Sequence, residues 1–267
     1  MNNMDRALRE LGEMDGLAAG QSWVHRRGPV AKLLVTIAYI AVVVSYGKYA
    51  LSSMIIMLLW PALLFQLSGV PVSACFRKLR FVLPLVLAVG LFNPIFDRAP
   101  MLYIGGTAIS GGTVSMLTLM LKGVLCLMAS FLLMATTSID ALCAALRRLR
   151  VPSTLVTLLL LTWRYVGVMT EELAVMTDAY HLRAPGQRGM DFSAWGSFLG
   201  QLLLRSMDRA EELYASMRLR GFRGEFYYAG ARRMDAADMG YLLVCVGAFA
   251  LFRWADVVQW LGRALVR

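Results

Sequence analysis

The chain has 267 residues, of which 58% are hydrophobic and only 16% are charged. An average soluble domain is about half apolar and about a quarter charged, so this composition is typical of a polytopic membrane protein. The apolar residues form runs that are too long to be the buried faces of ordinary amphipathic helices. A soluble enzyme fold is therefore excluded.

The net charge is +10, from 27 Lys and Arg against 17 Asp and Glu. Membrane proteins are commonly basic because Lys and Arg are retained in their cytoplasmic loops. No basic stripe interleaved with aromatic residues is present, so we expect no nucleic-acid partner. The lipid bilayer is the expected partner of the apolar surface.

The residue types that carry chemistry are sparse. The four cysteines show no CxxC spacing, and neither His25 nor His181 has a Cys or His three or four residues away. Glu171 and Glu172 could suggest a membrane protease, but no histidine occurs on a later span, and a solvated helix face is favoured. The chain has no phosphate-binding loop and no GxSxG turn. We therefore predict no catalytic residue, no metal site and no cofactor, and any ATP hydrolysis must occur in another subunit.

Hydropathy predicts an all-α integral membrane protein with about four to six membrane helices and long cytoplasmic helices. Nearly uncharged runs cover 30–46, 49–76, 81–96 and 113–136, and a last apolar segment extends from 239 to about 261. We expect a basic link at 77–80. In chain order, the predicted parts are a cytoplasmic N-terminal segment 1–29, membrane helices in 30–136, a cytoplasmic domain 137–238 and a C-terminal membrane helix in 239–267.

Two segments between these runs need separate interpretation. The stretch 97–112 is polar and rich in glycine, which predicts an extracytoplasmic loop. The apolar piece Val151–Trp163 ends before Arg164 and is too short to cross about 30 Å at about 1.5 Å per residue. We expect the region near 151–165 to lie along the membrane or dip into it.

The distribution of basic residues predicts the orientation. Thirteen of the 27 lie in 137–238, and four precede the first span, whereas the loops at Lys48 and Arg98 hold one each. Cytoplasmic loops carry the excess of Lys and Arg, so the N-terminus and 137–238 should face the cytoplasm.

Lys122, Asn93 and Pro94 lie inside the predicted spans and need separate interpretation. Lys122 either snorkels to the surface or faces the protein interior, because a lone charge at mid-bilayer costs about 2.5–3.5 kcal/mol, and a structural role is favoured. Asn93 and Pro94 are expected to bend or interrupt the third span. Proline removes a backbone donor, and asparagine can satisfy the carbonyl that is freed.

Two arginines in the cytoplasmic segment share one pattern. Arg183 and Arg220 are each preceded by apolar residues at offsets of 3, 7 and 10, which lie on one helix face, and each is followed by a helix stop. An arginine near a helix C-terminus also stabilises the helix dipole by about 0.3–1 kcal/mol, which is the plain alternative. The matched pair favours a docking element instead. The predicted packing faces are Tyr180, Met176 and Leu173 before Arg183, and Met217, Leu213 and Ala210 before Arg220.

Over about residues 20–225 the chain resembles the transmembrane T component of energy-coupling-factor (ECF) transporters, the EcfT/CbiQ family, and most closely its cobalt-type CbiQ branch. The resemblance rests on short motifs in a fixed order along one membrane chain. They are His25, Arg26, Arg27, Pro29, Ala31, Lys32, Leu33 and Leu34; Phe92, Asn93 and Pro94; Leu149–Pro152 with Leu159–Tyr165; Glu171 and Glu172; and Ser216–Phe222, S-M-R-L-R-G-F.

The family carries two short Ala-Arg-Gly motifs at the ends of two cytoplasmic helices, which couple it to ATPases. The corresponding residues are similar to these motifs in position and keep the arginine, but Ala184 replaces the first glycine and leaves the geometry of that tip open. The residues to which the coupling role is carried over are Leu182, Arg183 and Ala184, and Leu219, Arg220 and Gly221.

The resemblance implies a complex of this subunit with two ABC-type ATPase subunits and a substrate-capturing membrane subunit, CbiM-like if the substrate is cobalt. It implies a multi-pass protein of the bacterial or archaeal cytoplasmic membrane. Cobalt is suggested by the branch alone, and a T component that serves nickel or a vitamin is the alternative. A stand-alone carrier or channel is disfavoured because the predicted spans contain no Asp or Glu before Asp256, and a membrane enzyme is disfavoured by the missing catalytic cluster.

Overall fold

The computed structural model describes residues 12–13, 16–96, 100–104, 107–185, 189, 191–224, 226 and 234–254. Over these residues the fold is helical apart from one short hairpin, as the hydropathy predicts. Residues 255–267, in which the predicted C-terminal helix ends, lie outside this description. The helices are α2 (Pro29–Ser45), α3 (Leu51–Met57), α4 (Leu59–Ser68), α5 (Val72–Gly90), α6 (Asn93–Phe96), α7 (Gly111–Thr136), α8 (Ile139–Arg148), α9 (Ser153–Arg183), α10 (Phe192–Leu219) and α11 (Ala236–Trp254).

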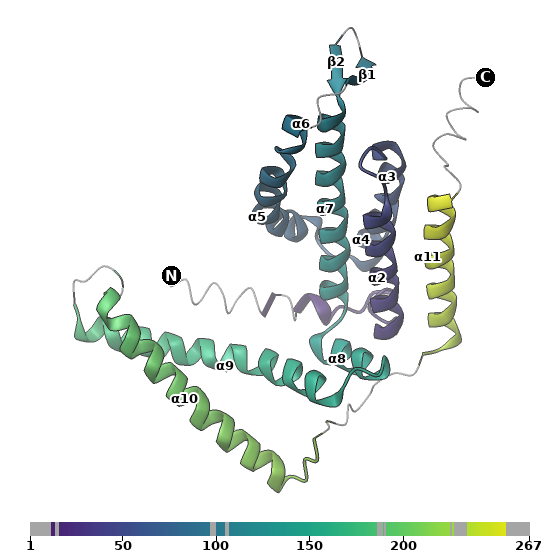
Figure 1. Ribbon diagram of the computed structural model, residues 1–267. Coiled ribbons are helices and arrows are strands. Elements are labelled where there is room, and N and C mark those ends of the chain that lie inside the picture. Colours follow the sequence, from purple (N-terminus) through teal and green to yellow (C-terminus); the bar gives the residue numbers. More distant parts are fainter. Residues whose placement is uncertain are drawn as a thin grey trace. The chain divides into compact units, whose positions relative to one another are not determined.

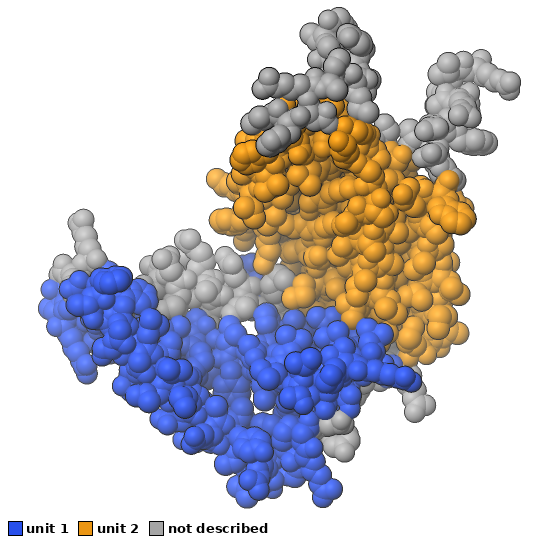
Figure 2. Space-filling view, viewed as in Figure 1, with its two compact units in different colours: residues 1–14, 139–231 blue, residues 15–138, 232–267 orange. Residues whose placement is uncertain are grey.

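The chain divides into two compact units, which are coloured separately in Figure 2. Unit 1 comprises residues 1–14 and 139–231, and unit 2 comprises residues 15–138 and 232–267. The chain passes from unit 2 into unit 1 directly after α7, between Ser138 and Ile139, and it returns before α11.

Unit 2 is built around α7, which lies between α5 and α2, while α11 packs on the other side of α2 (Figure 1). Its centre is aromatic. The Tyr39 ring stacks on Trp60 at 4.4 Å between centroids, and the edge of Phe249 approaches both rings at 5.3 and 5.5 Å. The Tyr39 hydroxyl donates to the Met57 carbonyl at 2.9 Å, so this buried ring also has a polar partner. Helices α2, α4 and α11 are thereby joined at one point.

Within the described residues, three helices are long and apolar enough to cross a membrane: α7, α9 and α11. Two shorter apolar helices cover Pro29–Ser45 and Ser53–Ser68. This pattern of length and composition confirms the predicted class, an all-α membrane protein with several candidate spans.

Lys122 has a structural role in unit 2. Its ammonium group donates to the Val44 carbonyl at 3.1 Å and to the Tyr46 carbonyl at 2.5 Å, at the C-terminal end of α2. A cation at this end satisfies carbonyls that the helix leaves free and complements the helix dipole. Lys122 thus has protein acceptors for its charge within unit 2.

The third predicted run differs in detail from the structure. Helix α5 starts at Val72 and includes Arg77, so the basic stretch 77–80 is part of a helix and is not a link. The helix ends at Gly90, and a new short helix begins at Asn93, the residue before Pro94. The Asn93 amide donates to the Ser115 hydroxyl of α7 at 3.2 Å, and not to a carbonyl freed by proline. A hydrogen bond to α7 therefore accompanies this break between α5 and α6.

The segment predicted as a loop at 97–112 contains an antiparallel hairpin. Its strands are β1 (Pro100–Ile104) and β2 (Thr107–Ser110), and α7 follows immediately at Gly111. Residues 97–99 and 105–106 of this segment lie outside the described part of the chain.

The described part of residues 139–231 in unit 1 contains α8, α9 and α10. Helix α9 runs without a break from Ser153 to Arg183, so the apolar piece at 151–163 and the helix that carries Arg183 form one element. Helicity continues past Arg164, whose guanidinium lies 3.4 Å from the Asp140 carboxylate of α8. Both side chains are well exposed, so this ion pair itself contributes little stability. An apolar cluster of Cys143, Val156 and Leu160 holds α8 and α9 together.

Candidate functional site

The arginine at the end of α10 is followed by a glycine in the left-handed conformation. Arg220 is the C-cap residue, and Gly221 has φ +85°. The Gly221 N–H donates to the Arg218 carbonyl, and the Phe222 N–H donates to the Met217 carbonyl, both at 3.0 Å. These two bonds form a Schellman motif, which satisfies carbonyls at the helix end. Gly221 thereby sets the direction in which the chain leaves Arg220.

We expect Gly221→Val to loosen this tip, because a β-branched residue in the left-handed region is strained by roughly 1–2 kcal/mol. Amide hydrogen exchange at residues 221 and 222 should be roughly five- to thirtyfold faster in the variant. Gly200→Val is the matched control, since Gly200 lies in the same helix with a negative φ and open space around it. Equal exchange at the tip in both variants would show that the motif is not what orders it.

The segment after Gly221 is anchored within unit 1 by two aromatic rings. The Phe222 and Phe226 rings lie 5.0 Å apart, and Phe226 packs against the cluster of Cys143, Val156 and Leu160. Burial raises the pKa of the Cys143 thiol, and the nearby Asp140 carboxylate raises it further. Phe222 was included in a sequence motif, but its contact with Phe226 was not predicted; the signal for it is a pair of aromatic residues just after a helix stop.

The end of α9 has a different geometry. Ala184 has φ −124° and ψ 67°, and its N–H donates to the Tyr180 carbonyl at 3.0 Å. Pro185 follows, and a residue before proline is disfavoured in the helical region. Helix α9 is therefore ended by a proline, whereas α10 is ended by a glycine. The replacement of glycine by Ala184 thus changes the backbone of the first tip.

Each helix end presents a leucine beside its arginine. Leu182 is 83% exposed and Leu219 is 90% exposed, and both Arg183 and Arg220 are also exposed. A leucine gains nothing from water contact, and an apolar side chain next to a guanidinium group is typical of a protein contact surface. We call Leu182–Arg183 and Leu219–Arg220 the two coupling tips.

The two coupling tips lie at opposite ends of an antiparallel helix pair (Figure 1). Arg205, at the middle of α10, forms an ion pair with Glu172 of α9. The Tyr180 hydroxyl accepts the Asp191 N–H at 3.2 Å and closes the connection between the helices. Because α10 has 28 residues, Arg220 lies about 40 Å from the start of its helix. The tips are therefore far enough apart to contact two different partners.

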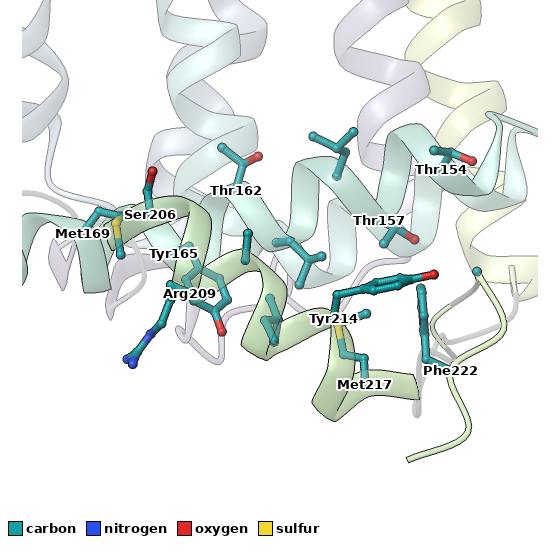
Figure 3. Close-up of a pocket in the computed structure, with 15 residues that line it drawn as sticks. Thr154, Thr157, Thr162, Tyr165, Met169, Ser206, Arg209, Tyr214, Met217 and Phe222 are labelled. Carbon is teal, nitrogen blue, oxygen red and sulfur yellow. The ribbon is translucent and has the colours of Figure 1, made fainter. Parts of the chain in front are cut away.

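An apolar groove of about 560 Å³ separates the N-terminal half of α9 from the C-terminal half of α10 (Figure 3). Thr154 and Met169 mark its extent on α9, and Ser206 and Met217 mark its extent on α10. Figure 3 shows Tyr214, Met217 and Phe222 gathered at one end of the groove, the end at the C-terminus of α10.

The six residues predicted to form packing faces separate into two groups. Ala210, Leu213 and Met217 line the groove, opposite the first half of α9. Leu173, Met176 and Tyr180 are half-buried farther along α9 and are not among the residues that line it. The antiparallel arrangement explains the separation, since equal offsets from two C-termini lie at opposite ends of such a pair. The sequence pattern identified the faces but could not show that they do not meet.

The family described as "CbiQ: Cobalt transport protein" matches residues 20–228. The energy-coupling factor transporter transmembrane protein EcfT of Lacticaseibacillus paracasei is 26% identical over 259 residues, which cover 88% of this chain and 96% of that protein. The cobalt transport protein CbiQ of Rhodobacter capsulatus is 36% identical over 103 residues, which cover 38% of this chain and 41% of that protein. The nickel permease LarQ of Lactiplantibacillus plantarum is 30% identical over 117 residues, which cover 44% and 43%.

The family match extends over most of the chain and includes both coupling tips. The relatives carry the names of general, cobalt and nickel branches, so the similarity is to the family as a whole. Proteins of this family are membrane components of transporters and are typically not catalytic. The chain belongs to the CbiQ/EcfT family of transmembrane T components of ECF transporters.

Proposed function

We propose that this T component transmits ATP-driven motion from two ABC-type ATPase subunits to a substrate-capturing membrane subunit, in the import of cobalt. The observation that carries the proposal is the pair of exposed Leu–Arg tips at opposite ends of α9 and α10. Two tips about 40 Å apart suit two copies of an ATPase.

The chemistry of the tips supports docking to acidic grooves. A guanidinium group forms bidentate, charge-assisted hydrogen bonds with carboxylates, which the ammonium group of lysine does not reproduce. Closure of an ATPase dimer on ATP would move the two tips relative to each other. Helices α9 and α10 have 31 and 28 residues and are joined by an ion pair and by the hydrogen bond between Asp191 and Tyr180. They are suited to carry that motion to the membrane.

Purification with endogenous partners tests this function. A coupling subunit should retain ATPase subunits in stoichiometric amount, together with one small membrane protein. Recovery of the chain alone, with transport activity after reconstitution, would favour a stand-alone carrier or channel and would refute the proposal.

Cobalt is the proposed substrate because the cobalt transport protein is 36% identical in the part that aligns. Nickel is the second candidate, since the nickel permease is 30% identical over a similar length. Uptake of radioactive cobalt(II) and nickel(II) by cells that express the whole complex distinguishes them. Saturable cobalt uptake that excess nickel does not suppress is the expected result, and the reverse would assign nickel. Transport of neither ion would indicate another substrate, such as a vitamin.

We further propose that unit 1 faces the cytoplasm, because it carries much of the positive charge of the chain. Ser197→Cys and Gly47→Cys, in a background without the native cysteines, are matched probes at exposed positions of the two units. We expect an impermeant maleimide to label residue 47 in intact cells and residue 197 only in inverted vesicles. Labelling of residue 197 from outside would overturn the orientation.

A further inference from the structure

The last turn of α7 is held by one side chain from the segment before α2 and one from the first turn of α2. The imidazole Nε2 of His25 lies 3.3 Å from the Ala135 carbonyl oxygen, and the Lys32 ammonium group donates to the Thr136 carbonyl at 2.6 Å. The end of a helix leaves such carbonyls without backbone partners. Two of them are satisfied here by residues more than a hundred positions away.

The contacts of the His25 ring identify Nε2 as its hydrogen-bond donor. Its Nε2 also lies 3.0 Å from the Leu17 carbonyl oxygen, and both carbonyls can only accept, so Nε2 carries a proton. The other ring nitrogen is 2.7 Å from the Ser22 hydroxyl, which orients the ring. His25 thus joins the N-terminal segment to α7 through a ring whose orientation is set by a third residue.

The burial of Lys32 makes its contact with Thr136 rigid. The side chain is only 5% exposed, and its ammonium group also donates to the His25 carbonyl at 3.4 Å. A buried cation that lost these carbonyls would lose its hydrogen-bond acceptors in a place poorly reached by water, which is unfavourable. The contact between Lys32 and Thr136 is therefore difficult to break locally.

The same segment is fixed at its other side to α11. Asp238 is fully buried and accepts the Gly28 N–H at 3.0 Å and the Asp235 N–H at 3.3 Å. The second of these bonds caps the start of α11. The residues 25–32 consequently bind the end of one membrane helix and the beginning of another. We call His25 and Lys32, with their bonds to Ala135 and Thr136, the exit clamp.

The position of the exit clamp in the chain indicates its purpose. Thr136 is the last residue of α7, Thr137 is extended, and the chain enters unit 1 at Ile139. A displacement of unit 1 therefore reaches α7 along the chain through residues 136–139. If the last turn of α7 unwound under that displacement, the motion would be absorbed there and would not reach the rest of the helix.

We propose that His25 and Lys32 are positioning residues that keep the end of α7 rigid, so that motion of unit 1 moves the membrane helices as a body. This inference rests on the proposed coupling function. It predicts that loss of the clamp uncouples ATP hydrolysis from transport, while the ATPases remain bound.

The test uses the whole complex in proteoliposomes and measures ATP hydrolysis and substrate uptake together. Lys32→Met removes the donor with little change of shape. Lys122→Met is the matched control. Lys122 is another lysine of unit 2 that donates to two carbonyls, and these lie at the end of α2 and not at the end of α7. We expect the ATP hydrolysed per substrate transported to rise at least fivefold in Lys32→Met and to stay within twofold of the parent in Lys122→Met.

A second pair of variants keeps the inference testable if Lys32→Met fails to insert. His25 is only half-buried, so its variants should fold. The amide of His25→Gln can still donate to Ala135, and its ratio should stay within twofold of the parent, whereas His25→Leu should raise the ratio at least fivefold. A ratio in the inserted clamp variants that matches the Lys122→Met control would overturn the inference. Failure of the parent complex to retain ATPases would instead refute the proposed function itself.

Discussion

Replacing both Arg183 and Arg220 with glutamate is expected to abolish retention of the ATPases and substrate uptake, while the protein still inserts into the membrane. Both side chains are exposed, so no buried packing is lost. Removing one partner of a charged contact in an interface costs about 2–5 kcal/mol, which weakens binding by more than tenfold for each tip. Copurification of the ATPases and uptake by the reconstituted complex measure the effect. Arg183→Ala alone should be milder than Arg220→Ala, because the first tip lacks the glycine-based geometry of the second.

Arg218→Ala distinguishes docking from a general effect of charge. Arg218 is exposed and lies in the same last turn of α10, so its removal changes the net charge and the helix-dipole interaction as Arg220→Ala does. We expect Arg218→Ala to retain the ATPases. If Arg218→Ala and Arg220→Ala have equal effects, or if the double variant transports at the parent rate, the arginines only cap their helices.

Gly28→Ala is expected to destabilise unit 2 by about 2–4 kcal/mol. The added Cβ would lie 2.6 Å from the Asp238 Oδ2 atom, which is closer than real Cβ contacts allow. The backbone at Gly28 has φ −59° and ψ 133°, which any residue adopts, so the effect is a clash and not backbone strain. To avoid the clash, Asp238 must leave the Gly28 N–H and become a buried carboxylate with fewer donors.

The midpoint of thermal unfolding in detergent measures this effect, and it should fall by roughly 5–15 °C in Gly28→Ala. Gly47→Ala is the matched control, because nothing lies within 4 Å of the position of its Cβ. In a background with Asp238→Ala, the further loss caused by Gly28→Ala should largely disappear. An unchanged midpoint in Gly28→Ala would show that α11 is not held at this point.

Much of the helix inventory could be predicted from the residues alone. A 24-residue run interrupted only by Lys122 has few alternatives to a spanning helix. Helix α7 begins within two residues of the predicted start of that run and ends at its predicted end. The ends of α9 and α10 were likewise predictable, since proline and glycine stop helices through local sterics. The coupling tips are thus a property of short sequence segments.

Hydropathy did not predict the full extent of α9. A span-length argument ends where the apolar run ends, at Arg164, but backbone hydrogen bonds continue a helix regardless of the polarity of its side chains. The basic stretch 77–80 was misassigned for the same reason, because charge alone does not interrupt α5. Hydropathy therefore located the apolar segments but not the bounds of the helices that contain them.

The sequence by itself determined the membrane class, the family and the two arginine-bearing helix ends, because each depends on residues that are neighbours in the chain. Only the tertiary structure decided which residues that are distant in the chain lie side by side. The Thr136 carbonyl meets Lys32 across 104 positions, and the Gly28 N–H meets Asp238 across 210. The antiparallel register likewise places the faces of Ala210 and Leu173 apart, although their offsets in the chain are equal. Such partners are chosen by packing and by the need to satisfy buried polar groups, which no local pattern encodes.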